Sequence, residues 1–291
     1  MNINYKDKIE KIDIALDKFI PKDSDLAPII YDSMRYSVFA GGKRLRPLLL
    51  IAAVEALGKK GDDYLNIACG MEMIHTYSLI HDDLPAMDND DYRRGKLTNH
   101  KVYNEAIAIL AGDALLTLAF EIMLEQKDVE AQTLLNVVKV IARAAGPAGM
   151  VGGQVLDMES EGKSLELDKL QLMHNAKTGA LFTAAIKAGG ILAGANKEQL
   201  AMLESFSEFY GLAFQITDDI LDAIGDQEKI GKPVGSDEKN NKATFVTLYS
   251  VEEAKKMAQN AVDKAINCLV DFGDNADLLK SFAEKLLVRD K

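Results

Sequence analysis

The sequence has no tryptophan and only two cysteines, Cys69 and Cys268, which stand far apart in the chain. Two isolated cysteines exclude a disulfide framework and a zinc site built from pairs of thiolates, and they fit a reducing compartment. Proline is sparse as well, at 6 of 291 residues, and the 21 glycines are an ordinary number, which together exclude collagen-like and low-complexity chains. With 48% apolar residues, the composition is that of a globular protein able to bury a sizeable core.

Positive charge is in deficit, because 34 Lys and Arg stand against 45 Asp and Glu, for a formal net charge of −11. This balance argues against a general nucleic-acid binder, which needs a basic surface to displace counterions. Long apolar runs are also missing. The longest uninterrupted one, residues 47–54, is far shorter than the about 20 residues of a membrane helix, and residues 1–10 lack the apolar core of a signal peptide. We therefore expect a cytoplasmic protein that is not embedded in a membrane.

Apolar residues recur at helical spacing almost everywhere in the chain, as at Leu134, Val137, Val138 and Ile141. No run with the alternation of a strand competes with this pattern, and no stretch resembles an interdomain linker. A mean helix length of about 11 to 12 residues then predicts roughly ten or more helices. We expect an all-α protein with a single domain over residues 1–291.

The strongest local signal is an acidic run at residues 81–91, which contains five aspartates. Neighbouring carboxylates repel one another unless a cation neutralises them, although a solvent-exposed acidic loop would have the same composition. On an ideal helix Asp82 and Asp88 lie about 240° apart and could not share a ligand. Pro85 is expected to end or kink the helix just after Asp83, so that Asp88 folds back.

A second acidic pattern places Gln215, Asp218, Asp219 and Asp222 at positions i, i+3, i+4 and i+7, which form one polar stripe on an apolar helix. Burying such a stripe without partners is costly, so it faces either solvent or cations. Two such patterns, each after an apolar helix, favour cations. Carboxylate oxygens with no nearby cluster of Cys or His suit Mg²⁺, which one or two carboxylates and phosphate oxygens normally hold.

Basic residues cluster beside glycines at two places, in the segment 41–47 with Lys43, Arg44 and Arg46, and at Arg93 and Arg94 directly after the first acidic run. Arg pairs with phosphate oxygens in a bidentate way and Lys acts as a point charge, so these cations are candidates for a diphosphate site.

His75 lies seven residues before Asp82 on the same helical face, and Ser78 lies between them. A histidine on an apolar helix is often only a core residue. Its alignment with Asp82 favours a phosphate contact instead.

Taken together, the motifs of this chain resemble those of the trans-isoprenyl diphosphate synthases of the bacterial farnesyl type. The motifs are Gly-Gly-Lys-Arg-Leu-Arg-Pro at 41–47, Asp-Asp-Leu-Pro-Ala-Met-Asp at 82–88, Arg-Arg-Gly at 93–95, Gly-Gly-Gln at 152–154, Lys-Thr-Gly at 177–179 and Gln-Ile-Thr-Asp-Asp-Ile-Leu-Asp at 215–222. The resemblance implies an all-α barrel of antiparallel helices, the isoprenoid synthase fold, with both aspartate motifs facing a central cavity, and a homodimer.

The resemblance also implies roles for individual residues. The diphosphate of isopentenyl diphosphate is expected at Lys43, Arg46, His75 and Arg94, and the allylic diphosphate at Arg93, Lys177 and Lys232. Asp82, Asp88 and Asp218 are expected to coordinate three Mg²⁺, with Asp83, Asp219 and Asp222 in support. Thr178 and Gln215 are expected near the developing allylic cation, and Lys242 is expected to close over the site.

The implied reaction condenses isopentenyl diphosphate with dimethylallyl or geranyl diphosphate to give farnesyl diphosphate. Tyr77, with Ser78 beside it, is the expected determinant of product length. It precedes Asp82 by five residues, about 7.5 Å of helix, and an aromatic ring there could floor the pocket for the growing tail. Helical geometry alone does not direct Tyr77 into that pocket, since it lies about 140° around the axis from Asp82, and a core tyrosine remains an alternative.

Three other interpretations stay open at this point. The same chemistry could stop one unit later, at geranylgeranyl diphosphate. A carboxylate-bridged di-iron bundle would use Glu-x-x-His, which residues 72–75 supply once, whereas that site needs two such motifs. The third is a non-catalytic homologue that binds a partner protein, although both acidic motifs and their basic companions are intact.

Overall fold

The computed structural model describes residues 5–22, 25–160, 167–224 and 244–289. Lys232 and Lys242, both expected to contact the substrate, lie outside the described residues. The elements of the first half are the helices α1 Lys6–Phe19, α2 Pro28–Val38, α3 Leu45–Ala56, η1 Gly61–Tyr64, α4 Leu65–Asp82, α5 Asn99–Tyr103 and α6 Glu105–Leu124, with the strands β1 Tyr92–Arg93 and β2 Lys96–Leu97. The second half contains α7 Ala131–Ala145, α8 Met150–Ser160, α9 Leu167–His174, η2 Asn175–Gly179, α10 Ala180–Leu192, α11 Lys197–Ile224, α14 Phe245–Leu248, α15 Val251–Asn267, η3 Val270–Ala276 and α16 Asp277–Leu286.

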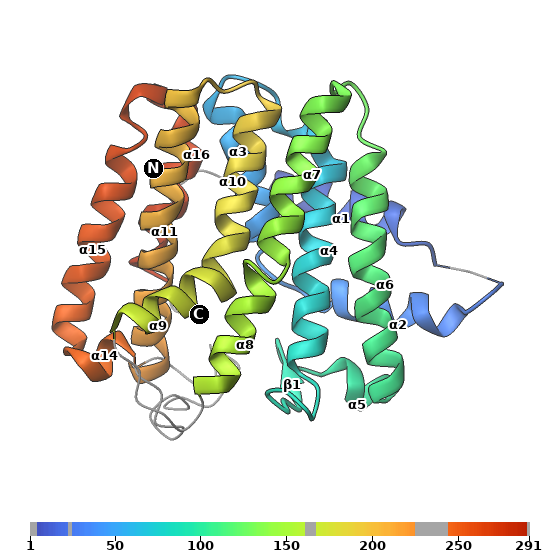
Figure 1. The fold of residues 1–291 in the computed structure, drawn as a ribbon. Coiled ribbons are helices and arrows are strands. Elements are labelled where there is room, and N and C mark those ends of the chain that lie inside the picture. The colour runs from blue at the N-terminus through green and yellow to red at the C-terminus, as the bar shows by residue number, and fades with distance from the viewer. Residues whose placement is uncertain (1–4, 23–24, 161–166, 225–243, 290–291) are drawn as a thin grey trace. The chain divides into compact units, whose positions relative to one another are not determined.

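The predicted all-α class is confirmed, because helices make up almost the whole described chain (Figure 1). The exception is a small antiparallel hairpin in which Tyr92 pairs with Leu97 and Arg93 with Lys96. Arg94 and Gly95, the two residues of its turn, both have positive φ, at 54° and 75°. Positive φ at both central positions is the geometry of the tight turn that matches strand twist. The sequence pattern did not predict these strands, which are only two residues long each.

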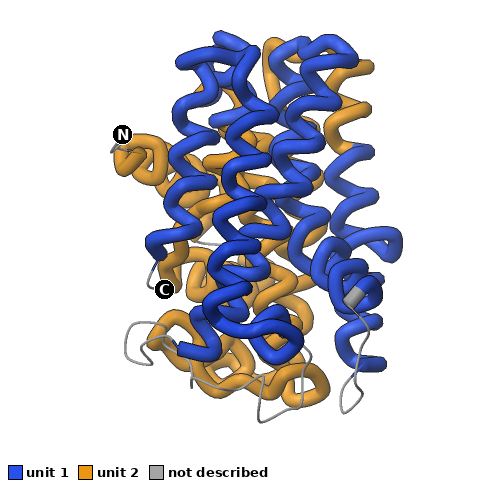
Figure 2. The backbone as a smooth tube through the Cα atoms, turned by 90° about the vertical axis from the view of Figure 1, so that its left-hand side faces the viewer, with its two compact units in different colours: residues 1–3, 52–61, 139–291 blue, residues 4–51, 62–138 orange. Residues whose placement is uncertain are grey.

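The helices divide into two compact units, shown in different colours in Figure 2. The first unit comprises residues 1–3, 52–61 and 139–291, and the second comprises residues 4–51 and 62–138. Within the described residues, the boundaries fall inside α3, η1 and α7, so none of them coincides with a linker. The prediction of a single domain over 1–291 stays a prediction.

In the second unit, α4 packs along α6, and α1 and α2 pack against α4. Two glycines permit the close approach of α4 and α6. A methyl group on Gly70 would lie 2.9 Å from the carbonyl oxygen of Ala119, and one on Gly112 would lie within 2.2 Å of the His81 ring. Interiors are packed as densely as organic crystals, so larger side chains at these positions would force the helices apart.

In the first unit, the long helix α11 contacts α10, α14, α15 and α16, and α8 contacts α9 and η2. Figure 1 shows α11 and α15 running side by side. Helix α10 is buried on most faces, and its residues Leu181, Ala185 and Ile186 are fully buried. Burying an aliphatic side chain of this size contributes about 1.5–3 kcal/mol, so α10 is a stabilising core element of this unit.

Two helical stretches of the described chain, Glu105–Leu124 and Ala131–Ser160, are long and apolar enough in composition to cross a membrane. Counting uninterrupted apolar runs does not detect α6, because Asp113 and Glu121 interrupt it. Core helices of globular proteins pass the same test, and α6 buries Ala111, Leu115 and Met123 inside its unit.

Candidate active site

The first acidic motif begins where α4 ends. The helix ends at Asp82 with Asp83 as its C-cap, as the position of Pro85 predicted. The chain then turns back on itself, since the Asp88 amide donates to the Asp82 carbonyl over 2.9 Å and the Met87 amide donates to Leu84 over 2.9 Å. The backbone therefore brings Asp88 beside Asp82, which a continuous helix would not do.

The hairpin that follows carries Arg93 back to this turn. The Nε of Arg93 donates to both carboxylate oxygens of Asp83, at 2.7 and 2.9 Å, and one terminal nitrogen lies 2.5 Å from the same group. Asp83 is only 3% exposed, so the pair is largely removed from water. Its predicted support of a metal, and the predicted contact of Arg93 with the allylic diphosphate, stay predictions. Both roles would involve side chains that already pair with each other, the carboxylate of Asp83 and the guanidinium of Arg93.

The basic loop before α3 contacts the turn of the same hairpin. A terminal nitrogen of Arg94 donates to the Gly41 carbonyl, and a Cβ on Gly42 would lie 2.6 Å from that nitrogen. Gly42 also has a φ of 130°, which an L side chain rarely adopts. The Gly-Gly pair thus lets an arginine from a segment 52 positions later lie directly on the loop. Lys43 is exposed next to it, and Arg46 lies half-buried in the first turn of α3.

Arg44 was expected among the cations of an anion site, and the structure corrects this. Its guanidinium is buried and donates to Asp13 Oδ1 at 2.8 Å, to Glu72 Oε1 at 3.0 Å and to the Val38 carbonyl at 2.8 Å. Each of the three guanidinium nitrogens thus donates to a group of the chain itself, in the buried interior. Arg44 is therefore an internal element of the site.

The half-buried His75 lies among these arginines. Burial lowers the pKa of its imidazole well below the ordinary 6.5, and the positive charges of Arg46 and Arg94 lower it further, followed by smaller contributions from Arg93 and Arg44. A nearby like charge disfavours the protonated form, so His75 is neutral at physiological pH. A neutral imidazole still donates one hydrogen bond, which is what a contact with a phosphate oxygen requires.

Tyr77 is buried in α4, and its ring packs edge-on against His81 with the ring centroids 5.7 Å apart. Burial raises the pKa of its phenol. His81 in turn lies 2.9 Å from the Ile109 carbonyl of α6. Ser78, the second residue expected to affect product length, bonds to the His75 carbonyl at 2.8 Å, so its hydroxyl is engaged with its own helix.

The second acidic motif lies in the last turns of α11, in the first unit. Asp219 is buried, accepts from Gln215 over 3.0 Å and accepts from the amide of Phe245 over 2.7 Å. Phe245 begins α14, so Asp219 holds the start of a later helix at the end of α11. Gln215, expected near the allylic cation, is thereby fixed within the stripe.

Asp218 is exposed on the same stripe and pairs with the last described residue. The guanidinium of Arg289 donates to Asp218 over 2.6 Å, and its carbon lies 4.4 Å from the centroid of the Phe214 ring. An arginine held by a carboxylate and an aromatic face is well ordered for recognising a further anion. Asp222 lies half-buried one turn further along the helix.

Lys177 and Thr178 lie in η2, a single π-helical turn between α9 and α10. Such turns carry one extra residue per turn and often mark functional sites. The ammonium group of Lys177 lies 2.5 Å from Asp157 of α8. A Cβ on Gly153 would lie 2.2 Å from the Lys177 amide nitrogen, so the Gly-Gly-Gln motif is what allows α8 to approach the bulge.

The carboxylates fit Mg²⁺ in their chemistry. Within the described residues, no three His, Cys, Asp or Glu side chains gather closely enough to hold a metal ion by themselves. Mg²⁺ is usually held by one or two carboxylates with substrate phosphates and water, so the returning turn of Asp82 and Asp88 suits a metal that arrives with a diphosphate.

Sequence reasoning assigned no role to Asp13, Asp157 or Arg289, and it considered Glu72 only for the di-iron alternative. Asp157 follows the Gly-Gly-Gln motif at helical spacing, and this spacing could have indicated that Asp157 lies on the same helical face as the motif. The partner of Arg289 is 71 positions away and that of Arg44 is 28 to 31 positions away, so no local pattern indicates them.

Known proteins resemble this chain over nearly its whole length. Residues 27–284 match the family described as Polyprenyl synthetase. A farnesyl diphosphate synthase of Geobacillus stearothermophilus is 48% identical over 97% of this chain and 95% of its own, and a geranylgeranyl diphosphate synthase of Cyanophora paradoxa is 46% identical over 97% and 94%. Among solved structures, a protein described as an FPP/GFPP synthase from Zymomonas mobilis has a TM-score of 0.88, with 39% identity over 97% of this chain and 96% of its own.

The environment of His75 predicts how it titrates. Its NMR signals, identified by their loss in His75→Gln, are expected to keep the shifts of a neutral ring from about pH 8 to about pH 6. The unfolded chain takes up a proton near 6.5, so the free energy of unfolding should fall as the pH drops below 6.5, and less steeply in His75→Gln. A midpoint for His75 at or above 6.5 would contradict the prediction.

Proposed function

Because this chain belongs to the polyprenyl synthetase family, we propose that it is a prenyltransferase that condenses isopentenyl diphosphate with dimethylallyl or geranyl diphosphate to give farnesyl diphosphate. The observation that carries the proposal is the turn after α4, where a hydrogen bond returns Asp88 to Asp82 while Arg93 is held at Asp83. Two carboxylates and a guanidinium at one helix end are the groups that a metal-bound diphosphate requires.

The binding roles divide between the two substrates. Lys43, Arg46, His75 and Arg94 bind the diphosphate of isopentenyl diphosphate, and Arg93, Lys177 and Lys232 bind that of the allylic substrate. The assignment of the first set is supported by the charges around His75, because Arg46 and Arg94 both lie close enough to lower its pKa. Lys177 is supported by its place in a π-helical turn, which fixes its backbone against Gly153.

The reaction needs no nucleophilic side chain. The C1–O bond of the allylic diphosphate breaks and its electron pair leaves with the diphosphate. The double bond of isopentenyl diphosphate attacks the allylic cation, and a proton then leaves the new carbon chain for the departing diphosphate. Arg93 and Lys177 stabilise the leaving group, while Thr178 and Gln215 lie near the cation.

Mg²⁺ is the proposed cofactor: Asp82, Asp88 and Asp218 would hold three ions, and Asp83, Asp219 and Asp222 would support them. When bound, it neutralises charge on the diphosphate and so favours cleavage of the C1–O bond. Arg289 pairs with Asp218, so its positive charge would lie beside a diphosphate bound at that carboxylate.

Tyr77 limits the product to farnesyl diphosphate. Its ring is buried and rests on His81, which is in turn held against α6, so it cannot swing away easily. The Cyanophora relative is described as a geranylgeranyl diphosphate synthase, and that product is the alternative.

The active form is a cytoplasmic homodimer. Its support is a face of α6 that exposes Ile109, Leu110 and Leu124, because a second copy would cover these apolar side chains. Insertion of α6 into a membrane is disfavoured, since Asp113 at the centre of the helix would cost about 2.5–3.5 kcal/mol there.

Product analysis tests the proposed reaction. With isopentenyl and geranyl diphosphates and Mg²⁺, the wild-type chain is expected to release mainly farnesyl diphosphate. Tyr77→Ala should release mainly geranylgeranyl diphosphate because it removes the ring, whereas Tyr77→Phe should retain the wild-type product. A wild-type chain that releases mainly geranylgeranyl diphosphate would show that the alternative is right.

The metal is tested separately, by turnover at saturating substrates. Chelation with EDTA should abolish turnover and added Mg²⁺ should restore it, while Asp82→Ala and Asp218→Ala should each lower turnover at least about a hundredfold. Asp91→Ala is the control, because Asp91 belongs to the same acidic run but pairs with Lys101. If both test variants stay within a few-fold of wild type, the metal role is wrong.

Sedimentation equilibrium tests the assembly. The wild-type chain is expected at twice its 31.8 kDa mass, and Leu110→Glu should shift the equilibrium toward the single chain because it introduces a charge on the exposed face of α6. A wild-type chain that remains single at micromolar concentration would contradict the homodimer.

A further inference from the structure

The Arg44 triad, which we define as Arg44, Asp13 and Glu72, joins three segments of the second unit. Asp13 belongs to α1, Glu72 to α4, and Arg44 to the loop that leads into α3. The side chains of Arg44 and Glu72 are 3% and 1% exposed, whereas that of Asp13 is 41% exposed. The interaction between a buried arginine and a buried carboxylate is strong in low dielectric, so Glu72 is the stronger of the two anchors.

The position of Arg44 in the loop makes its anchoring important for its neighbours. Its φ is 50°, in the left-handed region that side chains other than glycine, asparagine and aspartate seldom adopt. Its carbonyl accepts from the Leu48 amide over 3.1 Å, which is the first helical hydrogen bond of α3. The same residue therefore has an unfavourable backbone angle and starts a helix, and its ion pairs with Glu72 and Asp13 are what hold it there.

Lys43 precedes this residue and Arg46 follows it by two positions. Lys43 is exposed, and Arg46 is in the first turn of α3. The directions of both side chains depend on the backbone at Arg44. Glu72 also lies three residues before His75, on the same side of α4. The triad thus supports both elements to which the isopentenyl diphosphate contacts were assigned.

We propose that Arg44 is a positioning residue for isopentenyl diphosphate, held by Asp13 of α1 and Glu72 of α4. The proposal rests on the proposed function, which assigns Lys43, Arg46 and His75 to that substrate. It gives the N-terminal helix α1 a part in substrate affinity through Asp13, which contacts the loop and no substrate.

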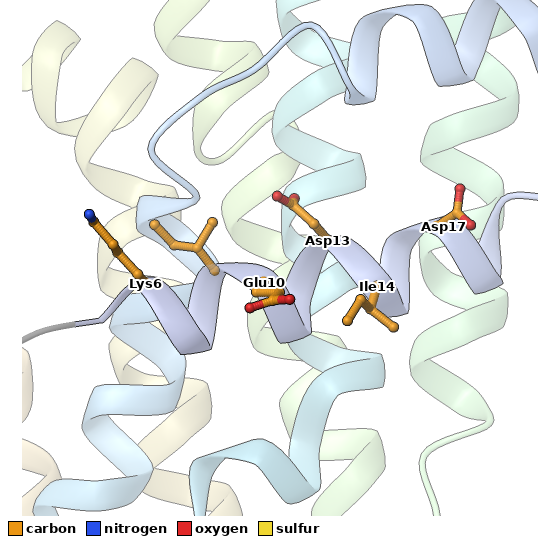
Figure 3. Close-up of a pocket in the computed structure, with 6 residues that line it drawn as sticks. Lys6, Glu10, Asp13, Ile14 and Asp17 are labelled. Atoms are coloured by element: carbon orange, nitrogen blue, oxygen red, sulfur yellow. The ribbon is translucent and has the colours of Figure 1, made fainter.

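Helix α1 offers a matched control. Figure 3 shows Asp13 and Asp17 leaving the same side of α1, one turn apart, beside the groove that Lys6, Glu10 and Ile14 also line. Asp17 pairs with Arg35 and with Lys22, and so is not part of the triad. Asp17→Asn removes the same charge from the same helix as Asp13→Asn but leaves Arg44 untouched.

The experiment is steady-state kinetics of the full chain, with each substrate varied while the other is saturating. Glu72→Gln is expected to raise the KM for isopentenyl diphosphate about tenfold or more, as loss of a supporting contact does at metal sites, and Asp13→Asn to raise it less. The KM for geranyl diphosphate and kcat should stay within about threefold, because the allylic contacts do not involve the triad. Asp17→Asn should resemble wild type.

Two further measurements keep the outcomes separate. Thermal unfolding verifies that each variant is folded, and Asp13→Asn decides the matter if Glu72→Gln does not fold.

Lys43→Ala tests the assignment of isopentenyl diphosphate to the loop, on which the proposal rests. If it raises the KM for isopentenyl diphosphate while the triad variants do not, the positioning role is overturned and the proposed function stands. If Lys43→Ala leaves that KM unchanged, the assignment of this substrate to the loop is itself wrong. Triad variants that raise both KM values equally also overturn the proposal.

Discussion

A charge that leaves water needs a partner of opposite sign, and the folded arrangement of this chain depends on meeting that constraint. Arg44 is buried with Glu72, Arg93 lies against the buried Asp83, and Lys177 contacts Asp157. Removing one member of a buried pair costs about 3–5 kcal/mol, because the other charge is left uncompensated. The pairs span 28, 10 and 20 positions of the sequence, and each joins two different segments. The same contacts that make burial possible therefore set the positions of the loop, the hairpin and the π-helical turn.

The fold class could be predicted from the sequence because it rests on a local property. Apolar spacing identifies helices such as α7 and α10 without knowledge of their neighbours, and Pro85 correctly predicted the end of α4. The hairpin could not be predicted, since strands of two residues are too short to show alternation. The division into two units within α3 and α7 was equally hidden, because contacts between distant residues decide it.

The candidate site was predictable where chemistry is concentrated in short motifs, and unpredictable where long-range contacts assign the roles. The return of Asp88 to Asp82 follows from a proline and an acidic run, and the structure confirms it. Arg44 is different, because its motif contains three cations that look alike in sequence. Only the burial of Arg44 beside Asp13 and Glu72 separates it from Lys43 and Arg46. Asp219 likewise resembles Asp218 in the motif but holds the amide of Phe245.

The π-helical turn at Asn175–Gly179 divides what looks like one long helix into two segments with different phase. One additional residue rotates everything after it by about 100° relative to an uninterrupted helix. A relative that lost a single residue between positions 175 and 179 would turn its lysine away from Asp157 or turn the whole of α10 away from α11. Insertions and deletions are usually tolerated in loops, but this chain has a position inside a helix where a change in length would alter the packing of two elements.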